Sequence, residues 1–383
     1  MTRNISNLSL PKDRLPAGQP EPVAARIGDF VITSAVPGVN AKTGEIPSDP
    51  ESQFAHAFEN VNTLLEKAGA DARSVGLVTV FTPGREGRAF INKPWLAMFP
   101  DEADRPARKT NHAGLPDGLA VQVQAVAIAR GKRKSLGIKG LKHKDPLPMG
   151  ARVGDYVFSS VFAPEDPATG KTVEGGPLAQ FKRAFDNGAL LMREAGGSEG
   201  DINHYWVFMQ DFKHQPDMVA EWVRRWPNFG DRPARKTLPY ELPAGGEIQT
   251  QFTAVVGATR SNFEVPGVGH HDPIPMGSRV GKLMQSSGIY GIDPADGKVV
   301  EGRDRQTDMV RRITLGLLEQ AGGGPADVVG LTVMVQKFSD VPYFRERLKE
   351  IFPRPESGPA LHFVKYRMPE HWHLQFHVTA LLG

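Results

Sequence analysis

The sequence predicts an α+β protein built from three copies of one unit, and three observations carry this prediction. The heptamer "DRPARKT" stands at 104–110 and again at 231–237. Longer motifs recur with nearly the same period: "ARIGDFVITSA" begins at residue 25, "ARVGDYVFSSV" at 151 and "SRVGKLMQSSG" at 278. Self-similarity at a fixed period indicates repeated structural units. Strand-like alternation and helix-like periodicity also follow in the same order within each copy.

The repeats divide the chain into units at 1–135, 136–262 and 263–383. Each unit opens with a pair of strands, such as "DFVITSAV" in the first. An amphipathic helix follows, because apolar residues recur at helical spacing. In the first unit these residues are Phe54, Phe58, Val61, Leu64 and Leu65. Each of these helices ends at a glycine, a common helix terminator, and the three glycines are Gly69, Gly196 and Gly322.

A strand, a shorter helix and two closing strands complete each unit, so the predicted order is β-β-α-β-α-β-β. This order places the helices on one face of a mixed sheet. The last strand alternates, as in "AVQVQAVAI", so one of its faces is packed and the other is presented. A single unit has nothing to cover that second face. Three units in a ring, with sheets inside and helices outside, would cover it and form a pseudo-trimer within one chain.

Composition excludes several classes of protein. The chain is 40% hydrophobic and 23% charged with a net charge of +3, which is typical of a globular protein. The densest basic run, at 129–144, favours a solvated linker over a nucleic-acid contact. The absence of cysteine excludes disulfides, thiolate catalysis and Cys-ligated metals. We expect a cytoplasmic protein with no membrane partner, because no apolar run has spanning length and the first 16 residues lack a signal-like core.

The ordered motifs resemble a known family. The set "TSAVP…TGEI", "AG…VVGLTVM" and "N…W…F…PARKT…LP…VQVQAVAI" is similar to the RidA/YjgF family of imine deaminases, three times over. The resemblance implies chorismate-mutase-like units. Members are single units that form homotrimers with a ligand cleft at each interface, and they hydrolyse 2-imino or enamine acids to 2-keto acids and ammonium. It therefore implies three clefts for a small carboxylate substrate, no cofactor, and a pseudo-trimeric monomer whose further dimerisation is left open.

The resemblance assigns a carboxylate-binding arginine to Arg108 and Arg235, in the two "PAR" motifs. A planar guanidinium meets a carboxylate with two parallel hydrogen bonds, which lysine does not do. The alternative is a structural arginine paired with Asp104 or Asp231 of the same heptamer. In the third unit Leu361 replaces the arginine, which predicts a degenerate third cleft.

Other family positions match in part. The resemblance assigns the early-strand serine to Ser34 and Ser160, with Ser287 in the third unit, and the asparagine of the second helix to Asn92. The family glutamate that positions water is replaced by glutamine in every unit. An amide can orient water but does not take its proton at neutral pH. The glutamines are Gln122, Gln249 and Gln375.

Two further groups have weaker patterns. Lys109 and Lys236 follow the arginines, and strand alternation predicts that they point away as solvated or boundary-pairing residues. His373 and His377 share a strand face and could bind a metal, but no Asp or Cys accompanies them. A polar strand face is the preferred interpretation, and no metal or cofactor is expected.

Three functions follow in order of preference. The first is a RidA-like hydrolase acting on a small carboxylate-bearing imine, enamine or related C–N compound at clefts between units. The second is a ring-opening amidohydrolase of the cyanuric acid hydrolase or barbiturase type, with Ser34/Lys109 and Ser160/Lys236 as serine–lysine pairs. The third is a non-catalytic carboxylate-binding or scaffold protein. A ribonuclease activity has no support from a catalytic histidine pair or a basic groove.

Overall fold

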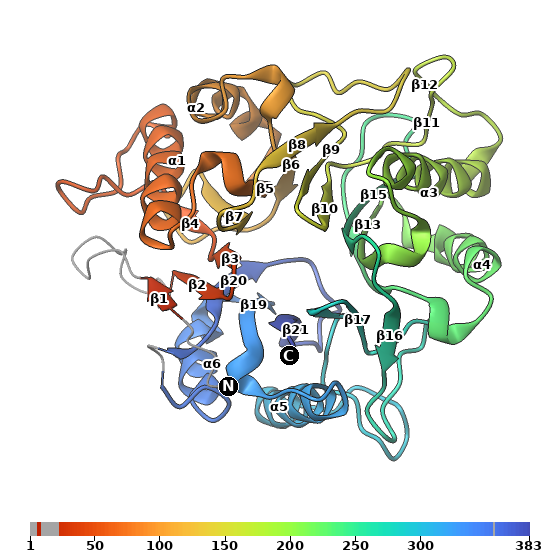
Figure 1. Ribbon diagram of the computed structural model, residues 1–383. Helices are drawn as coiled ribbons and strands as arrows, with labels where there is room; N and C mark the ends of the chain where they lie inside the picture. Colours follow the sequence, from red (N-terminus) through yellow and green to blue (C-terminus); the bar gives the residue numbers. More distant parts are fainter. Residues whose placement is uncertain (1–5, 9–22, 355–356) are drawn as a thin grey trace.

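The computed structural model describes residues 6–8, 23–354 and 357–383. It shows three large sheets around a shared interior, with one long and one shorter helix outside each sheet (Figure 1). The predicted α+β class is confirmed. Most of the N-terminal segment examined for a signal lies outside the described residues. Among those described, no helix has the length and apolarity needed to cross a bilayer.

The first sheet has the spatial order β1-β2-β3-β7-β5-β6, with β4 paired to β7. Strands β5 and β6 are parallel and the other neighbours are antiparallel, so the sheet is mixed as predicted. Its helices are α1 (Pro50–Lys67) and α2 (Asn92–Met98). Its strands are β1 (Ser6–Leu8), β2 (Ala24–Ile27), β3 (Phe30–Thr33), β4 (Val36–Pro37), β5 (Val75–Thr82), β6 (Ala107–His112) and β7 (Gln122–Ile128).

The second sheet has the order β14-β13-β15-β10-β9-β8, and β11 pairs with β12 beside it. Its helices are α3 (Gly176–Glu194) and α4 (Gln215–Arg225). Its strands are β8 (Arg133–Leu136), β9 (Gly150–Val153), β10 (Tyr156–Ser159), β13 (Ile202–Met209), β14 (Ala234–Pro239) and β15 (Ile248–Val255). The small ladder consists of β11 (Glu165–Asp166) and β12 (Lys171–Thr172).

The third sheet has the order β16-β17-β18-β21-β19-β20, which repeats the arrangement of the second. Its helices are α5 (Arg303–Gln320) and α6 (Val341–Leu348). Its strands are β16 (Arg260–Phe263), β17 (Gly277–Val280), β18 (Leu283–Ser286), β19 (Val328–Val335), β20 (Ala360–Lys365) and β21 (Leu374–Leu381).

The predicted β-β-α-β-α-β-β order is observed in each sheet, and one leading strand is added to it. Strands β1, β8 and β16 pair with the first strand of their sheets. Strand β8 spans the predicted boundary between residues 135 and 136, and β16 spans the boundary between 262 and 263. Each therefore carries the chain from one predicted unit into the sheet of the next.

Local chemistry explains the long helices. Asp49 caps α1 by accepting a hydrogen bond from the Ser52 backbone N–H, and Pro50 occupies the first helical turn. The predicted apolar face is buried against the sheet, including Phe54 and Leu64. After α1, Gly69 has a φ of +69°, a left-handed conformation that glycine adopts without a Cβ clash. The predicted glycine helix ends are therefore confirmed, with the same conformation in the other two copies.

The inner faces of the sheets bury one another. One apolar cluster combines Ile32 of β3, Phe158 of β10 and Val329 of β19. The approach is close, because a Cβ added at Gly330 would lie 2.9 Å from Cδ1 of Ile32. The second face of each sheet is thus covered by its neighbours, which supplies the burial that a single unit lacks.

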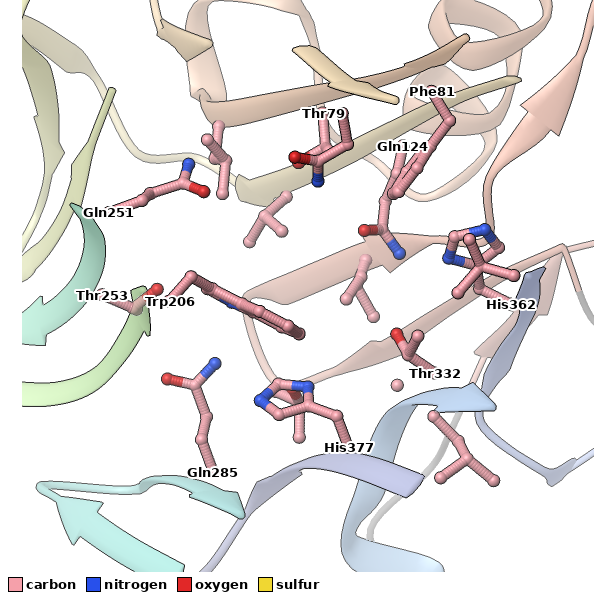
Figure 2. Close-up of a pocket in the computed structure, with 18 of the residues that line it drawn as sticks. Thr79, Phe81, Gln124, Trp206, Gln251, Thr253, Gln285, Thr332, His362 and His377 are labelled. Atoms are coloured by element: carbon pink, nitrogen blue, oxygen red, sulfur yellow. The ribbon is translucent and has the colours of Figure 1, made fainter. Parts of the chain in front are cut away.

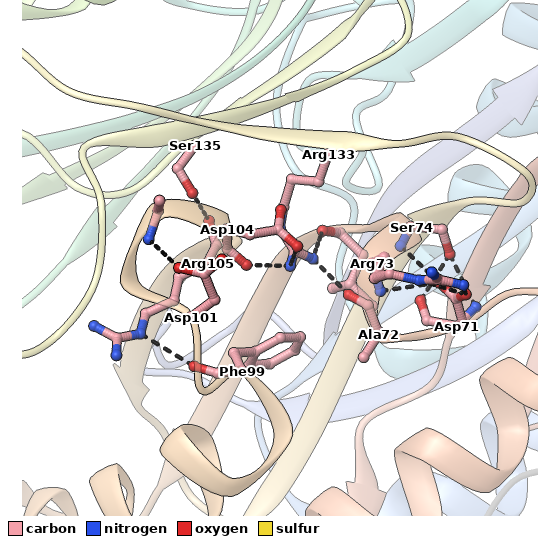
Figure 3. Close-up of polar contacts among 12 residues, drawn as sticks. Asp71, Ala72, Arg73, Ser74, Phe99, Asp101, Asp104, Arg105, Arg133 and Ser135 are labelled. Carbon is pink, nitrogen blue, oxygen red and sulfur yellow. Dashed lines mark hydrogen bonds and ion pairs between the residues drawn. The ribbon is translucent and has the colours of Figure 1, made fainter.

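Arg133 ties strand β8 to the preceding unit (Figure 3). Its Nη1 donates to the carbonyls of Ala72 at 2.5 Å and Val75 at 2.8 Å. Its Nη2 pairs with the Asp104 carboxylate at 3.1 Å. Arg260 has the same place one repeat later, with its Nε donating to the Ile202 carbonyl at 3.0 Å. Both arginines therefore hold a leading strand against the preceding unit by donating to its backbone carbonyls.

Candidate functional site

Four predicted site residues come together at the first boundary, between the first and second sheets. The backbone N–H of Arg108 in β6 donates to Ser160 Oγ at 3.0 Å, and its Nη1 donates to Asn92 Oδ1 at 3.0 Å. Nζ of the adjacent Lys109 donates to Gln249 Oε1 at 3.4 Å. The boundary therefore takes its arginine from one unit and its serine and glutamine from the next.

The second boundary repeats this arrangement one sheet later. The backbone N–H of Arg235 in β14 donates to Ser287 Oγ at 3.0 Å. Nζ of Lys236 donates to Gln375 Oε1. Arg235 therefore meets the predicted serine and glutamine of the third unit here.

The remaining predicted residues, Ser34 and Gln122, belong to the first unit, and the third boundary provides no arginine for them. Within the described residues, Ser34 Oγ and Gln122 Oε1 are buried without a hydrogen-bond partner. Leu361 occupies the arginine position in β20, and His362 follows it. The His362 ring packs edge-on against Phe81, with centroids 4.6 Å apart.

Each boundary arginine faces a carboxylate of the chain itself. Arg108 Nη2 lies 3.2 Å from Asp145 Oδ2, and Arg235 Nη2 pairs with Asp272. The arginines are only 2% and 1% exposed. Burial lowers the pKa of each guanidinium to about 10, against the opposing effect of its aspartate. Each predicted carboxylate-binding arginine therefore already pairs with an aspartate of the chain itself. For Arg108 this partner is not the aspartate of the heptamer, since Asp104 pairs with Arg133.

An aromatic ring supports each guanidinium. The Arg108 guanidinium carbon lies 4.8 Å from the centroid of Trp95, and that of Arg235 lies 4.7 Å from the centroid of Trp222. A cation held over an indole face gains stabilisation in addition to its ion pair. The indole ring, the guanidinium and the carboxylate therefore pack together in the same way at the first two boundaries.

Sequence reasoning missed the two aspartates. Asp145 and Asp272 stand in "HKDPLPMG" and "HHDPIPMG", each six residues before an opening strand motif. The same position in the first unit is Gln19, which lies outside the described residues. The aspartate is thus absent from the unit that would face Leu361. Alignment of the repeats shows that the arginine position at Leu361 and the aspartate position at Gln19 are both substituted. This joint substitution could have indicated from the sequence that the two residues pair.

A cavity of about 390 Å³ lies at the second boundary. Its lining includes Lys236 and the stacked rings of Tyr290 and Trp372, whose centroids are 4.4 Å apart. Within the described residues, the cavity residues His270 and Thr237 have a buried polar atom without a partner, Nε2 and Oγ1 respectively. The polar residues that line this cavity are Gln215, Arg235, Lys236, Thr237, His270, His271, Asp272, Tyr290, Tyr366, Arg367 and Gln375.

A smaller cavity lies where the three sheets meet (Figure 2). It has a volume of about 90 Å³, and residues of all three sheets line it, including Gln124, Trp206 and His377. Water occupies about 30 Å³ per molecule in the liquid, so this space suits a few water-sized molecules. The boundary cavity is therefore the better site for a metabolite.

The predicted serine–lysine pairs are not formed. Ser160 Oγ donates to the Pro148 carbonyl at 2.8 Å while accepting from the Arg108 backbone. Lys236 instead contacts Gln375 at the other boundary. A serine hydroxyl committed to two backbone groups lacks the adjacent base that activates a nucleophile, so the geometry gives no support to the amidohydrolase alternative.

His377 of strand β21 lies in the interior, with its ring centroid 4.7 Å from that of His204. Burial lowers the pKa of His377 to about 3, so the imidazole is neutral at physiological pH. In the part of the chain that the structure describes, no group of three or more His, Cys, Asp or Glu side chains could hold a metal ion.

Comparisons with known proteins show what the first unit of this chain is similar to. A family model described as endoribonuclease L-PSP matches residues 13–129. A 2-iminobutanoate/2-iminopropanoate deaminase of Escherichia coli is 33% identical over 106 residues, which are 27% of this chain and 83% of that protein. A RutC family protein of Haemophilus influenzae is 32% identical over 110 residues, covering 28% and 85%. The chain therefore belongs to the RidA/YjgF family.

A solved structure extends the likeness beyond one unit. A crystal structure of a chorismatase has a TM-score of 0.56 and covers 80% of this chain and 93% of its own. It is 17% identical in sequence, so it bears on the fold alone. The arrangement of three sheets in one chain thus has a counterpart among solved structures.

Proposed function

We propose that this chain is an imine or enamine deaminase that hydrolyses a small C=N compound in the cavity of the second boundary. The observation that carries the proposal is that cavity of about 390 Å³, which polar side chains of two units line. Relatives named 2-iminobutanoate/2-iminopropanoate deaminase support the reaction class. The site residues are Arg235, Lys236, Ser287 and Gln375.

We further propose that the three units form an intramolecular pseudo-trimer. The shared sheet order and the recurrent arginine–serine contact support this assembly. A pseudo-trimer would present three unequal boundaries. Arg108, Asn92, Ser160 and Gln249 build the first, Arg235 the second, and Ser34 and Gln122 the third.

In this proposal Arg367, rather than Arg235, binds the carboxylate of the substrate. Asp272 engages Arg235, so that guanidinium has no free face for a second carboxylate. Arg367 is exposed, lines the same cavity, and no ion pair joins it to an acidic side chain within the described residues. A charge-assisted hydrogen bond contributes about 1.5–3 kcal/mol. Arg367→Ala should therefore raise KM about tenfold or more while kcat changes less.

The direct test measures ammonia and 2-keto acid release from imines that an amino-acid oxidase generates in the assay. The wild type is compared with Gly288→Val, which fills the cavity, since a Cβ at Gly288 would lie 3.0 Å from Lys236 Cδ. Gly230→Val is the matched control, because a Cβ at Gly230 would meet nothing within 4 Å. We expect turnover by the wild type and the control, and its loss in Gly288→Val.

Two outcomes would contradict the proposal. The first is turnover in Gly288→Val equal to that of the wild type, which would remove the second boundary as the site. The second is tight binding of a carboxylated ligand with no ammonia release by any variant, which would favour the binding-protein alternative.

A further inference from the structure

Lys236 is a half-buried lysine whose side chain opens onto a cavity. Its Nζ contacts a neutral acceptor, Gln375 Oε1, and the side chain lines the space of about 390 Å³ at the second boundary. Asp272 lines the same cavity, but its carboxylate is held by Arg235 and by Gln215 Nε2, which lies 3.0 and 2.9 Å from its two oxygens. The aspartate that lines this cavity is therefore committed to other partners.

Lys109, the counterpart of Lys236 at the first boundary, has a different environment. Lys109 is 3% exposed, and its Nζ lies 4.1 Å from the ring centroids of both Phe208 and Tyr240. It pairs across the boundary as predicted, but it is not solvated. Two aromatic rings thus enclose the amine of the first boundary.

Two substitutions between the repeats account for the opening. The residue after the boundary serine is Val161 at the first boundary and Gly288 at the second. The residue at the Phe208 position is Met334, which lines the cavity. Gly288 leaves room beside the lysine, because a Cβ there would lie 3.0 Å from Lys236 Cδ, and methionine replaces the aromatic ring.

The electrostatics suit a nucleophile. Burial lowers the pKa of Lys236 to about 8, so a substantial fraction of the amine is neutral under mildly alkaline conditions. A desolvated lysine of this kind attacks C=N and C=O carbons without needing a separate base. Gln375, in the place of the family glutamate, does not take a proton from water.

We propose that Lys236 is the nucleophile of the deamination, attacking the imine carbon to form a Schiff base with the enzyme. The inference rests on the proposed function and names its covalent step. Lys236 would take over the task that the absent glutamate performs on water.

The step balances as follows. The Nζ lone pair adds to the carbon of the protonated imine, and a proton passes from Nζ to the substrate nitrogen. The bond from carbon to that nitrogen breaks, ammonia leaves, and the substrate carbon remains doubly bonded to Nζ. Water then adds to the same carbon, the bond to Nζ breaks, and the 2-keto acid leaves with the amine restored. One water is consumed and one ammonia released, with no oxidant or reductant.

The test is reductive trapping of the full chain. The protein is incubated with pyruvate or 2-oxobutanoate, which re-form the Schiff base from the product side, and sodium borohydride reduces it to a stable secondary amine. Intact mass and peptide mapping then locate the adduct. We expect one carboxyalkyl group on Lys236, none on Lys109, and at least about tenfold less labelling in Lys236→Met. Lys213→Met, at an exposed lysine, should label like the wild type.

The outcomes separate this inference from the proposed function. Ammonia release without an adduct on Lys236, or with equal rates in a folded Lys236→Met variant, would overturn the covalent step and leave the proposed function standing. Trapping without ammonia release from any imine would overturn the proposed function and the covalent step with it. Circular dichroism and thermal melting establish that Lys236→Met is folded, and Lys236→Arg, which retains the charge, should also lose the adduct.

Discussion

The first and second boundaries share a framework and differ in access. Both hold an arginine between an aspartate and a tryptophan ring, and both place a lysine beside a glutamine of the next unit. The first encloses its lysine between Phe208 and Tyr240, whereas the second opens Lys236 to a cavity beside Gly288. A few side chains next to a constant framework therefore decide which boundary admits a ligand.

The largest expected effect comes from breaking the framework at the second boundary. Asp272→Ala leaves the guanidinium of Arg235 buried without its carboxylate, and removing one partner of a buried pair costs about 3–5 kcal/mol. The free energy of unfolding in urea measures the loss. The double variant Arg235→Leu/Asp272→Gln, which copies the residues of the third boundary, should recover most of it. A single variant as stable as the wild type would show that the pair is not part of the framework.

The next largest effect is expected when the surroundings of Lys109 at the first boundary are opened. Val161→Gly/Phe208→Met gives Lys109 the neighbours that Lys236 has. We expect borohydride trapping on Lys109 to rise about tenfold, because Schiff-base formation requires access to a partly neutral amine. Peptide mapping reads out both lysines in one sample, so Lys236 serves as the internal control. Unchanged protection of Lys109 would mean that access is set by residues other than these two.

A third variant distinguishes the two ways of attacking the imine. Gln375→Glu restores the family carboxylate beside Lys236 and raises the pKa of that amine, because an opposite charge favours the cation. Because the pKa of Lys236 is about 8, a rise of one pKa unit lowers its neutral fraction at pH 8 about fivefold. We expect trapping and turnover at pH 8 to fall together by about that factor. If turnover rises while trapping falls, water activation by the glutamate is the operating route.

The smallest effect is a pH profile. Lys236, with its pKa lowered by burial to about 8, should be trapped about fivefold faster at pH 8 than at pH 7, because the neutral fraction rises as pH increases. An exposed lysine titrates near 10.4 and gains tenfold over the same step from a far lower fraction. Competitive labelling with peptide mapping separates the two. The charged and titratable groups that share the cavity are Arg235, His270, His271, Asp272, Tyr290, Tyr366 and Arg367.

Several of these features were readable from the sequence. The periods of the motifs and of the apolar residues predicted the repeated unit, its element order and the helix ends at Gly69, Gly196 and Gly322. Such features depend on local spacing, which a sequence displays directly. The leading strands β8 and β16 were missed, because four residues such as "RKSL" carry too little alternation to distinguish a strand from a linker.

The tertiary structure alone decided which residues meet. The sequence determined that Arg108 and Arg235 recur, but only the fold brings Asp145 and Asp272 onto them from the following unit. It also decided that Lys236 is half-buried and lines a cavity while Lys109 is enclosed. The physical reason is that local spacing sets secondary structure, whereas burial and ion pairing depend on contacts between residues of neighbouring units, from 37 to 140 positions apart.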